Sequence, residues 1–208
     1  MAAPGIQRYH RRFIHAELVL SMSKLPSFVA VELAKAYRLL NHGPVTLVTS
    51  AHQGERNIMA AAWAMPLDFD PPKVAVVIDR QTRSRELIEA SGRFALNIPT
   101  RALAAQVVAV GSRSGRDGDK FAEQGIETFL GQSDLPLVQG CAAWLECRIL
   151  PEPAMAERYD LFLGEVTAAW ADPALYSDGR WHFPDSDSQT LHYISGGAFF
   201  ASGDYFEV

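Results

Sequence analysis

Short apolar runs rich in β-branched residues recur along the chain, and turn residues separate them. Runs of this kind are typical of β-strands. The pattern predicts strands within residues 44–52, 57–69, 71–79, 93–99, 141–152 and 159–172, and a last strand with a tail within 191–208. Gly54 lies at the tip of the first predicted hairpin, and Pro71 and Pro72 mark the next loop because proline cannot donate to a strand ladder.

Helical spacing is confined to short segments between these strands. Apolar residues recur at helical intervals within 26–43, and Pro26 and Gly43 punctuate its ends. Residues 82–92 predict a helix with Thr82 or Ser84 as N-cap, Leu87 and Ile88 toward the core and Gly92 at its end. Further helical segments are expected within 100–115 and 119–125.

The order of these elements favours one fold class. Six or more strands with short helices at wide spacing do not alternate as a doubly wound sheet requires, so we expect a mainly β, closed or half-closed antiparallel barrel. Residues 1–24 are predicted to be an N-terminal arm, and 25–208 a single domain.

Composition narrows the class of protein further. The net charge of -5 argues against a general nucleic-acid binder, but it permits a local basic pocket. Cys141 and Cys147 are expected to be buried, reduced thiols on one face of a strand, since their spacing is even. We find no signal peptide and no membrane-spanning run, and we expect a cytoplasmic protein.

Motifs for several chemistries are absent from the sequence. It contains no GxGxxG, Walker or HExxH pattern, and its six histidines lack ligand spacing. The segment GSRSG places Arg113, not serine, where a nucleophile elbow requires serine. A metal centre and a hydrolase triad are therefore not expected.

Two stretches combine basic residues, hydroxyls and flexible backbone, which suits phosphate binding. The first is DRQTRSRE, residues 79–86, which follows a strand and opens a helix. The second is GSRSGRDGDKF, residues 111–121, whose glycines free the backbone. The alternative for each is a solvated surface loop with a helix cap.

A third stretch raises a different question. Ala60, Ala61 and Ala62 directly precede Trp63 in NIMAAAWAMPLDF. Small residues before a large flat one indicate either a tight packing corner or a flat ligand against the backbone.

Taken in order, NIMAAAWAMPLDFDPPKVAVVI, TRSRELIEASGRFALNIP, GSRSGRDGDKF and YDLFLGEV resemble the flavin reductase-like, FMN-binding split-barrel family, in its flavoredoxin-like branch. The resemblance runs from about residue 40 to 200. It implies an antiparallel, Greek-key-like split β-barrel with short inserted helices, FMN as cofactor and NAD(P)H as co-substrate. It also implies a homodimer with flavin near the subunit interface, and in some members a monooxygenase partner that receives reduced flavin.

The resemblance also implies roles for individual residues. The strand from Asn57 through Ala60, Ala61 and Ala62 to Trp63 would line the isoalloxazine, with Trp63 against the ring or walling its pocket. The residues expected near the ribityl and phosphate groups are Arg80 and Thr82, then Arg83 and Ser84. Asn97 matches a position near the flavin. A further family loop matches Ser114, Gly115, Lys120 and Phe121. In that loop Lys120 would be a cation near phosphate or flavin, and Phe121 would be an apolar wall. For Trp63 and Asn97 the alternatives are a core residue and a satisfied strand-end amide.

One departure from the family pattern leaves the function open. Many family reductases carry a histidine, linked to nicotinamide binding, just before the strand that here reads LFLGEV, where this chain has Glu157, Arg158 and Tyr159. Tyr159 can stack on a nicotinamide, but the match is lost. Three hypotheses follow: an FMN-dependent reductase, an FMN-binding electron-transfer protein without nicotinamide activity, and a split barrel that has lost flavin.

Overall fold

The computed structural model describes residues 28–204 and 206–208, so the expected arm over 1–24 lies outside the described residues. An eight-stranded antiparallel sheet dominates it, in the order β3-β2-β6-β9-β10-β5-β4, and β1 pairs with β10 beside this path. Its strands are β1 (Val29–Ala30), β2 (Thr46–His52), β3 (Glu55–Ala61), β4 (Ala64–Phe69), β5 (Pro72–Val77), β6 (Arg93–Pro99), β9 (Cys141–Ile149) and β10 (Leu161–Ala171). The expected mainly β, antiparallel fold is confirmed.

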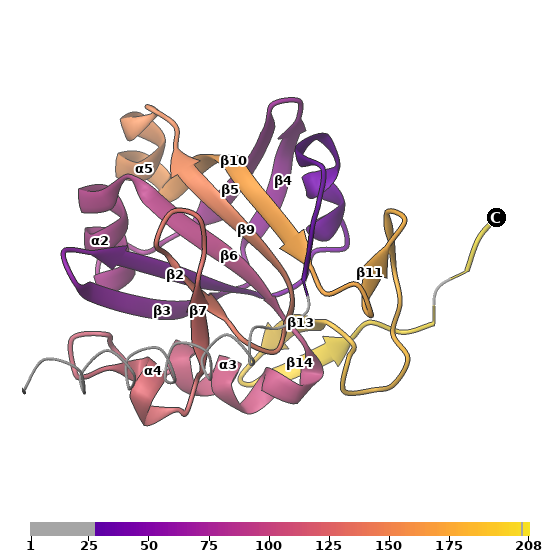
Figure 1. The fold of residues 1–208 in the computed structure, drawn as a ribbon. Helices are drawn as coiled ribbons and strands as arrows, with labels where there is room; N and C mark the ends of the chain where they lie inside the picture. Colours follow the sequence, from indigo (N-terminus) through magenta and orange to yellow (C-terminus); the bar gives the residue numbers. More distant parts are fainter. Residues whose placement is uncertain (1–27, 205) are drawn as a thin grey trace, which may run out of the picture.

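Short helices and three small hairpins surround this sheet (Figure 1). The helices are η1 (Leu33–Leu39), α2 (Arg83–Ser91), η2 (Arg101–Leu103), α3 (Ala104–Gly111), α4 (Lys120–Glu123) and α5 (Pro153–Tyr159). The hairpins pair β7 (Thr128–Leu130) with β8 (Pro136–Val138), β11 (Tyr176–Ser177) with β12 (Arg180–Trp181), and β13 (Leu191–Ser195) with β14 (Ala198–Ala201). Among the described residues, none of the helices is long and apolar enough to span a membrane.

The sheet curls because its two outermost strands are joined by a very short connection. β3 and β4 stand at opposite ends of the strand order, yet only Ala62 and Trp63 separate them in sequence. So short a link spans at most about 10 Å, so the two edges must meet at this corner. The expectation of one continuous strand over 57–69 is therefore wrong, since the barrel closes where that strand was predicted to continue.

Alternate strand residues feed two apolar clusters on the two faces of the sheet. Phe94 and Leu96 of β6 pack with η1 in one cluster, whereas Ala95 packs with residues of α3, α4 and β8 in the other. This alternation is what the pleat of a strand demands, and it places α3 and α4 together on one face.

Local sequence signals predicted α2 correctly, whereas three other elements differ from the predictions. Thr82 caps α2 by accepting a hydrogen bond from the backbone N–H of Arg85 at 3.3 Å, and Gly92 ends it at φ 70°. The helix expected over 26–43 is, in its described part, β1 followed by the 3-10 helix η1. Helix α5 was not predicted, and the last strand is a hairpin that turns at Gly196 and Gly197.

The two cysteines are buried free thiols, as expected, but they face opposite ways. Cys147 belongs to the cluster around Phe94, and Cys141 to the cluster around Trp144. Ile98 pairs with Ala143 and Pro99 with Cys141, so Ala142 is an extra residue in β9. Such a bulge inverts the alternation, which makes the same-face prediction wrong.

Candidate functional site

The outer edge of β3 is the centre of the candidate site. β3 pairs with β2 on one side only, so every second residue directs its backbone N–H and C=O away from the sheet. The carbonyl of Ile58 is one of these outward groups, because Lys120 donates to it from outside the ladder at 3.0 Å. By the same alternation Ala60 presents its backbone groups outward.

Lys120 fastens this edge to α3 rather than offering its charge to solvent. Its ammonium also donates to the carbonyl of Val110 at 2.8 Å, and the residue is only 5% exposed. Burial lowers the pKa of Lys120, and the nearby Arg113 lowers it further. The structure therefore places Lys120 as a strap beneath the edge, and its expected role as a cation near phosphate or flavin stays a prediction.

At one end of the β3 edge, polar side chains converge below the N-terminus of α2. The Asn57 carboxamide donates to the Ser84 hydroxyl at 3.0 Å, and both residues are buried. Ser50, directly opposite Asn57 on β2, has a buried hydroxyl without a hydrogen-bond partner. A side chain at Gly115 would overlap the Asn57 carboxamide, so the loop over 112–119 can approach only because residue 115 is glycine.

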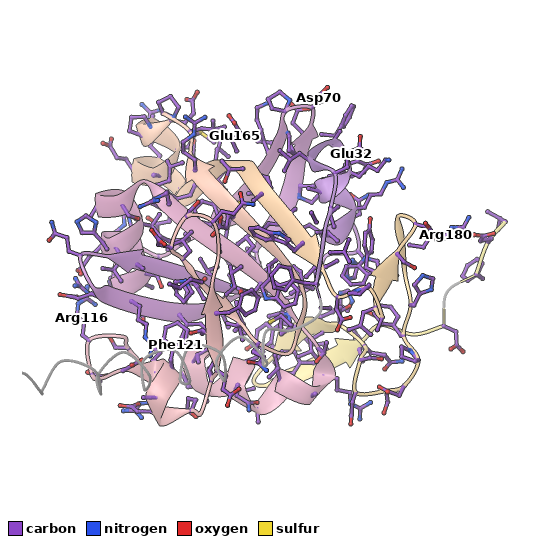
Figure 2. The ribbon with its side chains drawn as sticks, viewed as in Figure 1. Glu32, Asp70, Arg116, Phe121, Glu165 and Arg180 are labelled. Carbon is purple, nitrogen blue, oxygen red and sulfur yellow. The ribbon has the colours of Figure 1, made fainter. Side chains whose placement is uncertain are left out.

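Two arginines stand beside this cluster, and glutamates hold both. Arg83 forms ion pairs with Glu55 and Glu86, and Arg116 pairs with Glu86 while donating to the Gln81 carbonyl at 2.7 Å. Hydrogen bonds from Arg83, then from Arg116, lower the pKa of Glu86. Figure 2 labels Arg116 beside the loop that carries it. The sequence had marked Arg116 as part of a basic loop but not as a neighbour of α2.

The other expected phosphate ligands have different surroundings. Arg80 donates to the Glu157 carbonyl at 3.0 Å and pairs with Asp160 at 3.2 Å, which draws it toward α5. Thr82 is the N-cap of α2, with its hydroxyl donating to the Asp79 carbonyl at 2.8 Å. Ser114 accepts from the backbone N–H of Arg116 at 3.2 Å, which helps to shape the loop.

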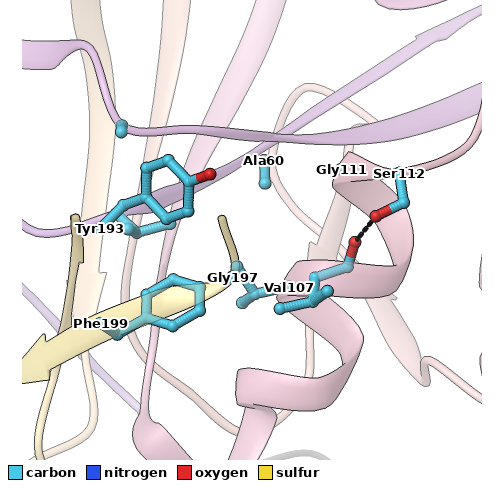
Figure 3. A pocket seen from close by; sticks show the side chains of 10 residues that line it. Ala60, Val107, Gly111, Ser112, Tyr193, Gly197 and Phe199 are labelled. Carbon is cyan, nitrogen blue, oxygen red and sulfur yellow. Dashed lines mark hydrogen bonds between the residues drawn. The ribbon is translucent and has the colours of Figure 1, made fainter. Parts of the chain in front are cut away.

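At the other end of the β3 edge lies a cavity of about 270 Å³ (Figure 3). Its lining comes from three elements: the end of β3, the C-terminal half of α3, and the hairpin β13–β14. The lining residues include Ala60, Ala62, Val107, Gly111, Ser112, Tyr193 and Phe199. Sequence reasoning did not assign Tyr193 or Phe199 to the site, because only the fold brings them to β3.

The remaining predicted residues do not line this cavity. Asn97 is a buried amide that donates to the Leu47 carbonyl at 2.8 Å and accepts from the Val138 backbone N–H at 2.8 Å, so the fold itself satisfies it. Ala61 packs into the core, and Trp63 is 74% exposed, so Trp63 is not a core residue of the described chain. Phe121 is buried, with the Arg56 guanidinium 4.5 Å from its ring centre.

Tyr159 also lies apart from the cavity. It ends α5, which Figure 1 shows at the far end of the sheet from α3. Its side chain is 61% exposed. Nothing among the described residues groups three or more His, Cys, Asp or Glu side chains as a metal site would require.

Comparison with known proteins agrees with this architecture. A family model described as "Flavin reductase like domain" matches residues 38–195, so the chain belongs to the flavin reductase-like family. A crystal structure described as an FMN-binding domain of a flavin reductases-like enzyme from Shewanella baltica OS155 is 49% identical, with a TM-score of 0.85 over 88% of this chain and 98% of that chain. The fold is therefore the split barrel expected from the sequence.

Three further proteins are similar to this chain over most of its length. The Escherichia coli K12 protein YddH is 49% identical over 85% of this chain and 95% of its own. Flavoredoxin of Desulfovibrio vulgaris (Miyazaki F) is 26% identical, with a TM-score of 0.69 over 80% of this chain and 90% of that chain. HsaB of Mycobacterium tuberculosis, the reductase subunit of a flavin-dependent monooxygenase, is 28% identical over 66% of this chain and 73% of its own. Membership of the family, together with the similarity to flavoredoxin and HsaB, supports a flavin-related redox function.

The Lys120 strap makes a prediction about stability. Replacing Lys120 with Met should lower the free energy of unfolding by about 1–3 kcal/mol, because the buried carbonyls of Ile58 and Val110 lose their donor. Urea denaturation followed by circular dichroism measures this change. Lys73→Met is the matched control: Lys73 forms a partly exposed pair with Asp68 at 2.6 Å, which should contribute less than about 1 kcal/mol. Equal effects of the two substitutions would refute the role of Lys120 as a strap.

Proposed function

We propose that the protein is an FMN-binding oxidoreductase of the flavin reductase type, which moves hydride or electrons between NAD(P)H and flavin or a downstream acceptor. The observation that carries this proposal is a pair of features at the two ends of the outer edge of β3. It has a basic, hydroxyl-rich end at α2 and an apolar cavity at α3. Asn57 and Ala62 are separated by about 17 Å along an extended strand, which suits an extended molecule with a phosphate at one end and a flat ring at the other.

The residues at the α2 end fit a phosphate. Arg83 and Arg116 supply guanidinium groups, Ser84 supplies a hydroxyl, and the first turn of α2 has backbone N–H groups without intrahelical partners. The unpaired hydroxyl of Ser50 lies opposite Asn57, which itself donates to Ser84. An incoming phosphate would replace Glu55 and Glu86 as the partner of the arginines. These ion pairs are partly exposed, and pairs of this kind are weak.

The residues at the cavity end fit a flat ring. Ala60 and Ala62 have side chains small enough for a ring to approach the backbone, and the outward N–H of Ala60 can donate to a polar ring edge. Tyr193 and Phe199 form an aromatic wall, with ring centres 5.4 Å apart. When bound, FMN would supply the redox chemistry itself, and a backbone donor at the ring would favour its reduced, more negative form.

We include a homodimer in this proposal because Trp63 and β4 expose several large apolar side chains. Trp63, Met65, Leu67 and Phe69 are all at least 47% exposed, and a bulge between Pro66 and Asp68 interrupts the strand alternation within this row. A row of exposed apolar side chains on an edge strand is typical of a surface that another chain covers. Trp63 adjoins Ala62 of the cavity, so a second copy on this row would also wall the proposed flavin site.

The placement of Tyr159 favours a second candidate function, that of an FMN-binding electron-transfer protein without nicotinamide activity. The family histidine is missing there, and α5 is remote from the cavity. Similarity to a flavoredoxin is compatible with this alternative. Similarity to HsaB is compatible with a monooxygenase partner that takes reduced flavin.

An absorption spectrum taken before and after addition of FMN, and then of NADH or NADPH under argon, tests the proposed function. We expect the oxidised flavin band of bound FMN to bleach on addition of one of the nicotinamides. Bound flavin that stays oxidised with both would support the electron-transfer alternative. A protein that does not bind FMN at all would contradict both proposals.

Phosphate recognition predicts how arginine substitutions change affinity. Arg83→Gln and Arg116→Gln should each weaken FMN binding roughly 10- to 100-fold, because each removes a charge-assisted hydrogen bond. Riboflavin, which lacks the phosphate, should bind both variants as it binds the original protein. Arg148→Gln is the matched control, since Arg148 pairs with Glu165 on the surface at 3.3 Å. Loss of riboflavin binding in step with FMN binding would show that the arginines shape the site without recognising phosphate. Fluorescence quenching of either flavin gives both affinities.

A further inference from the structure

A row of charged side chains with alternating sign lies beside the N-terminus of α2. Arg83 forms ion pairs with Glu55 and Glu86, and Glu86 also pairs with Arg116. Glu55 is the most exposed member of the row, with 65% of its side chain exposed against 27% for Arg83. Two arginines therefore flank Glu86, and a further carboxylate stands on the solvent side of Arg83.

Glu55 begins β3, which places it beyond the polar cluster at Asn57. Side chains two residues apart on a strand face the same way and lie about 7 Å apart. Glu55 and Asn57 therefore share the face of β3 that meets α2, and each contacts a residue of that helix. From Ala60 toward the tip of the hairpin, the strand edge thus passes a cavity, a polar cluster and then a carboxylate.

The two arginines match a terminal phosphate better than a phosphate inside a diphosphate link. A terminal phosphate carries about −1.5 to −2 charge at pH 7 and has three free oxygens. Each phosphate of a link between two groups carries a single charge and has fewer free oxygens. Arg83 and Arg116 together match the first kind, whereas the second leaves one guanidinium without an equal charge. FMN ends in a terminal phosphate, while FAD continues through a second phosphate to adenosine.

A second phosphate that continued along β3 would meet Glu55. Like charges about 6 Å apart near a protein surface repel each other enough to lower affinity roughly tenfold. Two arginines share a cavity at the hairpin tip with Glu55, and both have other partners. Arg56 pairs with Asp119 at 2.8 Å, and Arg93 donates to the carbonyl of Ser133 at 3.2 Å.

We propose that Glu55 is a specificity-determining residue, which makes the site select FMN over FAD. Once a phosphate replaces Glu55 as the partner of Arg83, the freed carboxylate keeps its charge and stands where a second phosphate would continue. The phosphate of FMN ends before this point. This role of Glu55 rests on the proposed function, because it requires a flavin along β3 with its phosphate at α2.

Titration of the full chain with FMN, FAD and riboflavin, followed by fluorescence quenching, tests the role of Glu55. The original protein should bind FMN at least about tenfold more tightly than FAD. Glu55→Gln keeps the size of the side chain and removes its charge, so it should lower this ratio of affinities about tenfold. The ratio is the informative quantity, because the freed Arg83 strengthens the binding of both nucleotides. Riboflavin, which has no phosphate, should bind Glu55→Gln and the original protein equally.

Two controls accompany this titration. Glu165→Gln also removes the carboxylate partner of an arginine, since Glu165 pairs with Arg148 at 3.3 Å, and it should leave the ratio unchanged. Added salt should lower the ratio in the original protein, because it screens the repulsion between exposed charges. If Glu55→Gln does not fold by circular dichroism, this salt dependence decides the question.

Several results would overturn the role of Glu55. These are equal affinities of the original protein for FMN and FAD, an unchanged ratio in a folded Glu55→Gln variant, or a fall in riboflavin affinity that matches the change for FMN. FMN binding with an unchanged ratio would remove the selection by Glu55 and leave the proposed flavin site standing. A protein that binds none of the three flavins would overturn both. Bound FMN that no nicotinamide reduces would contradict the reductase function and leave the selection intact.

Discussion

The unpaired outer edge of β3 is the constraint around which the rest of the molecule is arranged. An exposed strand edge carries backbone donors and acceptors that would pair with another chain, and folded proteins normally cover it. Here the cover is divided along the strand. The loop over 112–119 lies against Asn57, the Lys120 ammonium binds the carbonyl of Ile58, and Ala60 is left beside a cavity. The same division produces a polar end, a strapped middle and an apolar end along one strand edge.

The arrangement of charged side chains at the polar end is the second feature that bears on the site. Arg83 and Arg116 share Glu86, so two positive charges meet one carboxylate at this point, with Glu55 on the far side of Arg83. Groups held this way are preorganised for an anion while remaining paired without one. The carboxylates keep the basic cluster compact, and an anion of higher charge density can displace them because both partners are partly exposed.

How far the sequence predicts this structure depends on how local each signal is. Thr82 and Gly92 identified α2 because a cap acts within one turn of its helix. The sequence offered a corner at Ala60 to Trp63 only as one of two alternatives, since the corner follows from closure of the whole sheet and not from local preference. Helix α5 is seven residues long, too short to show a period, and the bulge at Ala142 is visible only in the pairing of β9 with β6. In the site, residue types predicted a phosphate-binding loop and a small-residue strand. Tertiary contacts decided that Lys120 is a strap, that Asn97 belongs to the core and that Tyr193 reaches the cavity.

The most direct test of the account is backbone amide hydrogen exchange, followed by NMR, with and without FMN. Outward backbone groups at the end of β3 should be the ones that bind the ring. Exchange at Ala60 should therefore slow on addition of FMN, together with the amides in the first turn of α2, while the inward-facing amides of β3 keep their protection. Saturating FMN that leaves Ala60 unchanged, or that protects another sheet edge instead, would contradict the claim that the β3 edge is the flavin site.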